Sequence, residues 1–265
     1  MERKEYDPQI FAGTASYYSL YRRGYPRELF DYLMSRFCVE SGDSCLDLGC
    51  GTGQLAIPLA QRGIKVIAMD PDQDMLIRLQ RSSADLGDDV SGRIKRICGT
   101  SWDLVEYDFK VNFATMGESF HWMDRAATLT ELSKKILGGG VAVISKRINH
   151  DPTIKEILDA TIASFLGSKR LAGSGFYSHP IRTHEDVLRA SEFVGYSEEH
   201  FRYTESWTKE AYLGFLYSTS YASRRLLGDR VHDFEHELLR RLDDAMSDNK
   251  SDVAIDVVSY TALTK

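Results

Sequence analysis

The chain has 265 residues, of which 43% are hydrophobic, and its 33 Lys and Arg against 39 Asp and Glu give a formal net charge of −6. This length suits one large α/β domain, or one domain with an inserted cap. The weak acidity, with no long Lys/Arg tract, disfavours a nucleic-acid partner. No long apolar run is present, and residues 1–10 have no apolar core. We therefore expect neither a membrane span nor a signal peptide, and a cytoplasmic location.

The metal-binding residue types show no pattern typical of a metal site. His232 and His236 have the spacing of the two histidines in the zinc motif HExxH. Asp233 stands where that motif has its Glu, so the motif is absent. No CxxC pair occurs, so we expect no metal and reduced thiols. The cysteines are Cys38, Cys45, Cys50 and Cys98.

In the first half of the chain, short apolar runs alternate with segments of helical periodicity. A helix is predicted to begin at Pro26 and continue to Phe37. The predicted strands are Ser44–Leu48, Lys65–Asp70, Ile94–Cys98, Val111–Met116 and Val141–Ser145. The predicted helices between them are Gly53–Gly63, with a kink or late start at Pro58, Asp72–Ser83 and Asp124–Leu137. This alternation predicts an α/β fold built on a mostly parallel sheet.

The pattern is looser after Lys146. The predicted elements there are the helices Thr153–Leu166 and His184–Phe193, a strand Phe201–Trp207, a helical stretch Lys209–Met246 broken near Gly228, and a last strand Ala254–Leu263. We expect the last strand to run antiparallel to the others, and the helical stretch before it to form a cap.

The densest pattern is CLDLGCGTG, Cys45–Gly53, between a predicted strand and a predicted helix. Gly49 and Gly51 allow a sharp turn and a close approach of the backbone to a ligand. The spacing is G-x-G-x-G, whereas a dinucleotide fingerprint needs its third glycine where Gln54 stands, which disfavours a dehydrogenase. Asp70 ends the next strand, where an acid can accept hydrogen bonds from both ribose hydroxyls.

These motifs resemble a known family. LDLGCGTG followed by VIAMDPDQDML resembles the first two motifs of class I S-adenosylmethionine (SAM)-dependent methyltransferases. FATMGESFHWMDR, SYYSLYRRGYP and GFLYSTSY resemble the small-molecule subgroup that includes trans-aconitate methyltransferases. The resemblance implies a Rossmann-like methyltransferase sheet, SAM as cofactor and S-adenosylhomocysteine as product.

The resemblance also implies a cofactor site. Its residues would be Asp47, Gly49, Gly51, Asp70, Pro71, Met75, Thr100, Ser101, Trp102, Met116 and Gly117. Asp70 would hold the ribose, while Met116 and Gly117 would lie near the sulfonium. Thr100 departs from the family pattern, where an Asp is often found, although a Thr hydroxyl can also accept a hydrogen bond.

His121 is the candidate catalytic residue, because it follows the fourth strand and could face the transferred methyl group. It would act as a general base, orient the substrate, or simply pack against the cap. The candidate substrate residues are Tyr18, Tyr21, Arg22, Trp122, Tyr217 and Tyr221. For the aromatic members the alternative interpretation is core packing. Arg22 would pair with a carboxylate, either of SAM or of an acid substrate.

We therefore predict methyl transfer by in-line displacement to a small-molecule acceptor, with O-methylation of a carboxylate or phenol favoured. The alternatives are a non-catalytic SAM-binding regulatory protein and an N- or C-methyltransferase of another metabolite. The chain is expected to be a monomer or homodimer. The predicted organisation is an N-terminal helical lid over 1–40, a SAM-binding core over 41–207, a cap insertion over 208–250 and a last core strand over 251–265.

Overall fold

The computed structural model describes residues 6–177, 180–246 and 248–265. Within them, a seven-stranded sheet has the order β3-β2-β1-β4-β5-β9-β8. The strands are β1 (Ser44–Leu48), β2 (Lys65–Asp70), β3 (Ile94–Cys98), β4 (Phe113–Gly117), β5 (Gly140–Asn149), β8 (Val194–Thr208) and β9 (Lys250–Leu263). β9 pairs antiparallel with both β5 and β8, whereas β1 to β5 pair in parallel. The predicted α/β sheet with an antiparallel last strand is confirmed.

The strand order reverses between β1 and β4. Cys45 on β1 pairs with Val66 of β2 on one side and with Phe113 of β4 on the other. Their side chains are buried, as expected for central parallel strands covered on both faces. In open α/β sheets the crevice at the carboxyl ends of such strands is the usual place for a ligand.

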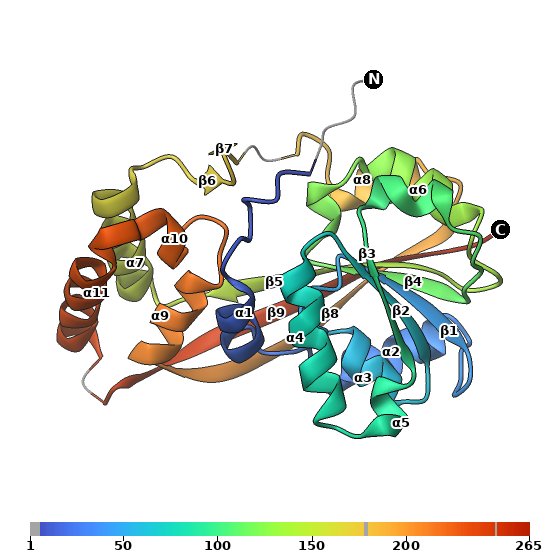
Figure 1. Ribbon diagram of the computed structural model, residues 1–265, viewed down its shortest axis with the longest axis horizontal. Helices are drawn as coiled ribbons and strands as arrows, with labels where there is room; N and C mark the ends of the chain where they lie inside the picture. The colour runs from blue at the N-terminus through green and yellow to red at the C-terminus, as the bar shows by residue number, and fades with distance from the viewer. Residues whose placement is uncertain (1–5, 178–179, 247) are drawn as a thin grey trace.

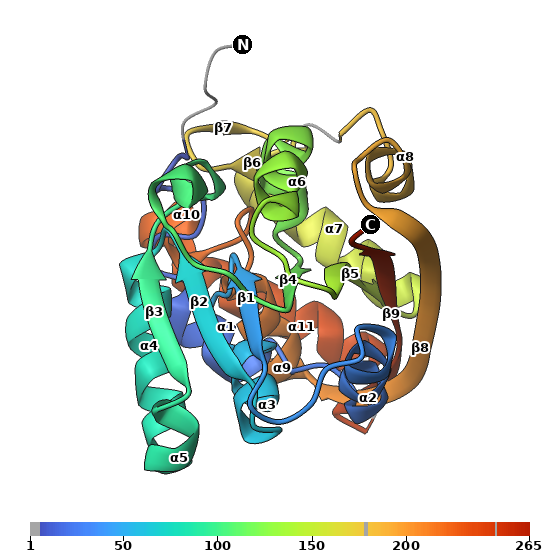
Figure 2. The same cartoon turned by 90° about the vertical axis from the view of Figure 1, so that its right-hand side faces the viewer.

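Helices cover both faces of the sheet (Figure 1). One face is covered by α2 (Arg27–Arg36), α3 (Ala56–Gln61) and α4 (Gln73–Ala84), and the other by α6 (Arg125–Ser133) and α8 (His184–Arg189). In Figure 2 the sheet runs from β3 on the left to β8 on the right, with one helix layer above it and the other below. The helix predicted after the glycine turn does start late: α3 begins at Ala56, which places Pro58 in its first turn, where proline is tolerated.

A group of helices extends the molecule beyond the sheet, at the left of Figure 1. It consists of α7 (Pro152–Leu166), α9 (Lys209–Tyr217), α10 (Arg224–Leu227) and α11 (Val231–Ala245). α7 packs against α11, although the predicted cap began only at residue 208. We call these four helices the cap. The N-terminal α1 (Ala15–Tyr21) packs on α9, where a Cβ on Gly214 would lie 2.3 Å from the Tyr21 ring.

No helix in the described part of the chain combines the length and apolar character needed to cross a bilayer.

Candidate functional site

The glycine turn follows β1. Gly49 has φ +73° and Gly51 has φ +53°, in the left-handed region that favours glycine. A Cβ on Gly49 would lie 2.4 Å from Ser119 Cβ, so the turn and the segment after β4 approach each other closely. The N–H groups of Gly49 and Cys50 both donate to the Met69 carbonyl, at 2.7 and 3.1 Å, which ties the turn to β2.

Asp70 ends β2 beside this turn. Its Oδ2 accepts from the Gly51 N–H at 2.8 Å, and its Oδ1 accepts from the Asp72 N–H at 2.9 Å. The residue is only 8% exposed, and burial raises the pKa of its carboxyl to about 6. A carboxylate has about four acceptor positions, so this one can still accept hydrogen bonds from a ligand with two adjacent hydroxyls.

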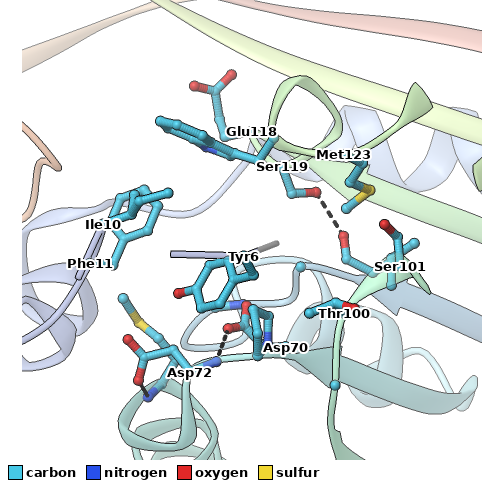
Figure 3. A pocket seen from close by; sticks show the side chains of 18 of the residues that line it. Tyr6, Ile10, Phe11, Asp70, Asp72, Thr100, Ser101, Glu118, Ser119 and Met123 are labelled. Carbon is cyan, nitrogen blue, oxygen red and sulfur yellow. Dashed lines mark hydrogen bonds between the residues drawn. The ribbon is translucent and has the colours of Figure 1, made fainter. Parts of the chain in front are cut away.

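A first cavity lies over the turn and Asp70, with about 850 Å³ of space not filled by protein, part of it open to solvent. Nine of the predicted cofactor residues line it: Gly49, Gly51, Asp70, Pro71, Met75, Thr100, Ser101, Trp102 and Gly117. Figure 3 shows Asp70 and Asp72 on one side of this cavity and Thr100 and Ser101 on another. The fold therefore brings predicted residues from four separate segments of the chain to one cavity.

The segment before α1, residues 6–14, also lines the first cavity; it falls within the lid predicted over 1–40, although none of its residues was among the predicted site residues. Tyr6, Ile10 and Phe11 face it (Figure 3). The segment is fixed from outside, because Asp7 Oδ2 accepts from the N–H and the hydroxyl of Ser174 at 2.6 and 2.7 Å. We call residues 6–14 the N-terminal strap. Its sequence has no periodic pattern, so only the folded chain shows which of its side chains face the cavity.

A small third cavity adjoins the first and contains Asp47 and Arg22. Asp47 is buried; its Oδ1 accepts from the Thr115 hydroxyl at 2.9 Å, and its Oδ2 has no partner among the described residues. Burial raises the pKa of this carboxyl to about 7. A cavity that holds both an unpartnered buried carboxylate oxygen and a guanidinium suits a ligand that carries an ammonium and a carboxylate.

A second cavity of about 1140 Å³, counted in the same way, lies between the sheet and the cap. The residues shared with the first cavity are Phe11, Tyr18, Glu118 and Trp122. His121, Arg22 and Tyr221, all predicted site residues, also line the second cavity. The cap and the sheet thus enclose a second space directly beside the first.

Four cations line the second cavity: Lys155 and a group of three, Arg22, Lys146 and Arg170. Arg22 donates to the Ser218 hydroxyl at 2.8 Å, Lys146 donates to two backbone carbonyls at 2.9 Å, and Arg170 lies 4.6 Å from the Tyr221 ring centre. None of the three has an ion-pair partner within the described ranges. Burial lowers the pKa of Lys146 to about 8.

The remaining cation of this cavity, Lys155, forms a salt bridge of 2.5 Å with Asp159, so these two charges neutralise each other. Glu118 is the carboxylate that remains opposite the three cations. The second cavity is therefore suited to an anionic ligand.

Three predicted site residues lie in packing positions instead. Met116 belongs to β4 and is fully buried in the core. Tyr21 packs on the surface of α9 at Gly214, and Tyr217 is buried with its hydroxyl donating to Glu235 at 2.9 Å. Apolar and aromatic side chains look alike in sequence whether they pack a core or line a cavity, which explains this difference.

Thr100 is also engaged differently from the expectation. Its hydroxyl donates to Asp103 Oδ2 at 2.9 Å and accepts from the Trp102 N–H at 3.3 Å, as the N-cap of a short 3₁₀ helix, Ser101–Glu106. Thr100 lines the first cavity, but its hydroxyl already holds the local turn. No group of three or more His, Cys, Asp or Glu residues suited to a metal occurs among the residues that the structure describes.

Comparison with known proteins agrees with this geometry. Residues 45–140 match the family described as "Methyltransferase domain". This range contains the glycine turn, Asp70 and the segment after β4. Residues 45–140 are thus similar to methyltransferase domains, and the fold and the glycine turn agree with that similarity.

Among curated proteins, an uncharacterized methyltransferase from Mycobacterium tuberculosis is 31% identical over 130 residues, which cover 49% of this chain and 49% of that protein. An uncharacterized methyltransferase from Schizosaccharomyces pombe is 26% identical over 124 residues, 46% of each chain. The chain thus matches about half the length of these relatives.

Solved structures resemble almost the whole chain. A candidate type II methyltransferase from Anaeromyxobacter dehalogenans superposes with a TM-score of 0.62 at 22% identity, covering 92% of this chain and 97% of that one. A SAM-dependent methyltransferase from Thiobacillus denitrificans, solved with S-adenosylhomocysteine, gives 0.52 at 19% identity over 96% and 98%. At these identities the likeness concerns the fold.

Proposed function

We propose that this protein is a SAM-dependent methyltransferase that transfers a methyl group to a small acidic molecule and releases S-adenosylhomocysteine. The observation that carries the proposal is the Asp70 carboxylate, held by the Gly51 N–H at 2.8 Å on the floor of a cavity that adjoins a second, cationic cavity. The first cavity supplies a place for the cofactor, and the second supplies a place for the acceptor.

The described residues fit the parts of SAM. Asp70 would accept hydrogen bonds from the ribose hydroxyls, while Pro71 and Met75 would contact the adenine. In the third cavity, the free Asp47 oxygen and the Arg22 guanidinium would hold the ammonium and the carboxylate of the methionyl part. Bound in this way, SAM would supply an activated methyl group, and the protein would align the acceptor and exclude water.

The second cavity supports an acid as acceptor, because Lys146 and Arg170 remain there after Arg22 is assigned to SAM, and they outnumber the one unpaired carboxylate, Glu118. O-methylation of a carboxylate or a phenol fits this charge, as does the sequence resemblance to trans-aconitate methyltransferases. His121 lines the same cavity, where it would orient the acceptor or accept a proton.

A protein with this fold that does not transfer methyl groups is the second candidate. A [4+2]-cyclase, SpnF, shares the fold with a TM-score of 0.50 at 16% identity, so the fold by itself does not establish methyl transfer. The second cavity beside the first favours an enzyme, because a protein that only binds SAM needs no space for an acceptor.

Calorimetry with SAM, S-adenosylhomocysteine and NAD tests the proposal. We expect the first two to bind and NAD not to bind. Asp70→Ala should weaken SAM binding at least tenfold, whereas Asp74→Ala, an exposed carboxylate one turn away on α4, should leave it unchanged. Folded wild-type protein that takes up neither SAM nor its product would refute the cofactor assignment. Incubation with labelled SAM and a panel of small acids, phenols and amines then tests transfer.

A further inference from the structure

Glu118 occupies a strained position directly after β4. Its φ is +53°, in a region where residues with a side chain are disfavoured and glycine is not. Such outliers persist at functional sites more often than elsewhere. A glycine would form this turn more easily, so the carboxylate is present in spite of its backbone cost.

The carboxylate of Glu118 is only partly occupied by the protein. Its Oε1 accepts from the Lys146 N–H at 2.7 Å. Among the described residues no other group donates to it, and no cation lies within ion-pair distance. One carboxylate oxygen is thus available to a ligand.

Glu118 lies where the cavities meet. It lines the first, second and third cavities, and Figure 3 shows its carboxylate pointing away from Tyr6 and Asp70. Arg22, Lys146 and Arg170 act on it from a distance and lower its pKa, but burial has the larger effect and raises that pKa above its usual value. The raised pKa makes Glu118 a stronger base than an ordinary glutamate, so its ionised form is suited to accept a proton.

His121 is placed less directly. It lines the second cavity, and its ring packs against Trp122 with 4.9 Å between ring centres. Of these two titratable side chains, Glu118 is the one that borders both the first and the second cavity.

We propose that Glu118 accepts the proton of the methyl-accepting atom, and that the acceptor is a small carboxylic acid bearing a hydroxyl or amino group at that position. This inference rests on the proposed function, since it needs a methyl donor in the first cavity. The acceptor's carboxylate would face Lys146 and Arg170, because Arg22 is assigned to the methionyl carboxylate of SAM. In the step, the methyl–sulfur bond breaks with its electron pair left on sulfur, a bond from oxygen or nitrogen to the methyl carbon forms, and the acceptor's proton passes to Glu118.

A matched set of acceptors tests the substrate class: 4-hydroxybenzoate, 4-aminobenzoate, benzoate and 4-hydroxybenzamide, each with labelled SAM. We expect methylation of the hydroxyl or amino group in the first two, and at least tenfold slower transfer to the last two, which lack either the donor or the acid. A methyl ester as the main product overturns the inference, as does a panel in which the hydroxy and amino acids are not turned over.

Substitution tests the role of Glu118. Glu118→Gln should lower kcat about 100-fold or more while SAM affinity by calorimetry stays within twofold, and Glu118→Asp should recover part of the rate. Glu106→Gln, an exposed glutamate on the 3₁₀ helix Ser101–Glu106, should leave both unchanged. Turnover by Glu118→Gln within threefold of wild type overturns the inference. If Glu118→Gln fails to bind SAM, the test passes to Glu118→Asp, whose carboxylate is one methylene further from the acceptor. A Glu118→Asp variant that binds SAM and keeps the wild-type kcat would also overturn the inference. Lack of SAM binding by wild type would instead refute the proposed function.

Discussion

Asp70 and Gly51 are joined by a hydrogen bond of 2.8 Å from the backbone N–H of the glycine to the carboxylate Oδ2. The bond connects the end of β2 to the turn after β1 and fixes the orientation of a buried acid in the floor of the first cavity. The same bond stabilises the charged form of a group whose burial favours the neutral form. The turn and the acid therefore form one unit, and the affinity for a ribose should depend on the charge of that unit.

SAM binding should weaken at acidic pH. Burial raises the pKa of Asp70 to about 6, so the carboxylate becomes protonated below that pH and loses acceptor capacity for the ribose hydroxyls. We expect Kd to rise toward tenfold per pH unit from Asp70 below about pH 6, after a first increase near pH 7 where Asp47, the partner proposed for the methionyl ammonium, becomes protonated. Calorimetry from pH 5 to 8 measures this, with Asp70→Asn as a control that should show weaker binding and a flatter profile. A wild-type Kd that stays constant down to pH 5 contradicts the assignment.

Gly49→Ala should lower the stability of the protein more than alanine at a glycine that also has a positive φ but has free space where the Cβ would lie. Gly49→Ala would add a Cβ 2.4 Å from Ser119 Cβ at φ +73°, whereas Gly87, at φ +101°, has no atom within 4 Å of the added Cβ. The backbone penalty alone is about 1–2 kcal/mol, and overpacking adds about 1–3 kcal/mol. Urea unfolding should show the larger loss for Gly49→Ala, together with loss of SAM binding. Equal losses would mean that the turn and Ser119 can separate freely.

The N-terminal strap should control how long the cofactor stays bound. Asp7 accepts two hydrogen bonds from Ser174, and the neighbouring Gln9 carbonyl accepts from Arg225 at 2.7 Å. We expect Asp7→Ala to raise the dissociation rate of S-adenosylhomocysteine severalfold with little change in global stability, because Asp7 is at the surface. Stopped-flow displacement measures the rate.

The strap prediction has an internal control. Ser174→Ala should produce a smaller increase, because it removes the hydroxyl donor but keeps the N–H that also donates to Asp7, and the double variant should be no faster than Asp7→Ala alone. Additive effects would indicate that the two residues act separately.

The sequence predicted the sheet, and most of the proposed cofactor residues line one cavity, because both features depend on local order along the chain. Apolar runs, glycine spacing and the terminal acid are linear patterns, and they brought Gly49, Asp70 and Thr100 to one cavity. The acceptor side was predicted less well. Lys146 and Arg170 belong to segments far apart in sequence and are ordinary surface residues by composition, and the strained φ of Glu118 leaves no trace in residue type. Only the folded chain brings these charges together.

Asp47 should make the stability of the protein depend on pH. Its pKa is raised from 3.8 to about 7, mainly by burial, so the folded state holds this proton more tightly than the unfolded state. The sign follows: stability from this group is greatest below about pH 4 and is lost as pH rises to about 7, by about 4 kcal/mol in all. Asp47→Asn removes this titration and keeps an acceptor for the Thr115 hydroxyl. We expect the variant to gain stability relative to wild type as pH rises from 5 to 8, as measured by urea unfolding at each pH. A difference between the two proteins that does not change with pH would show that Asp47 titrates normally, and would remove the reason to treat its free oxygen as a site for the methionyl ammonium.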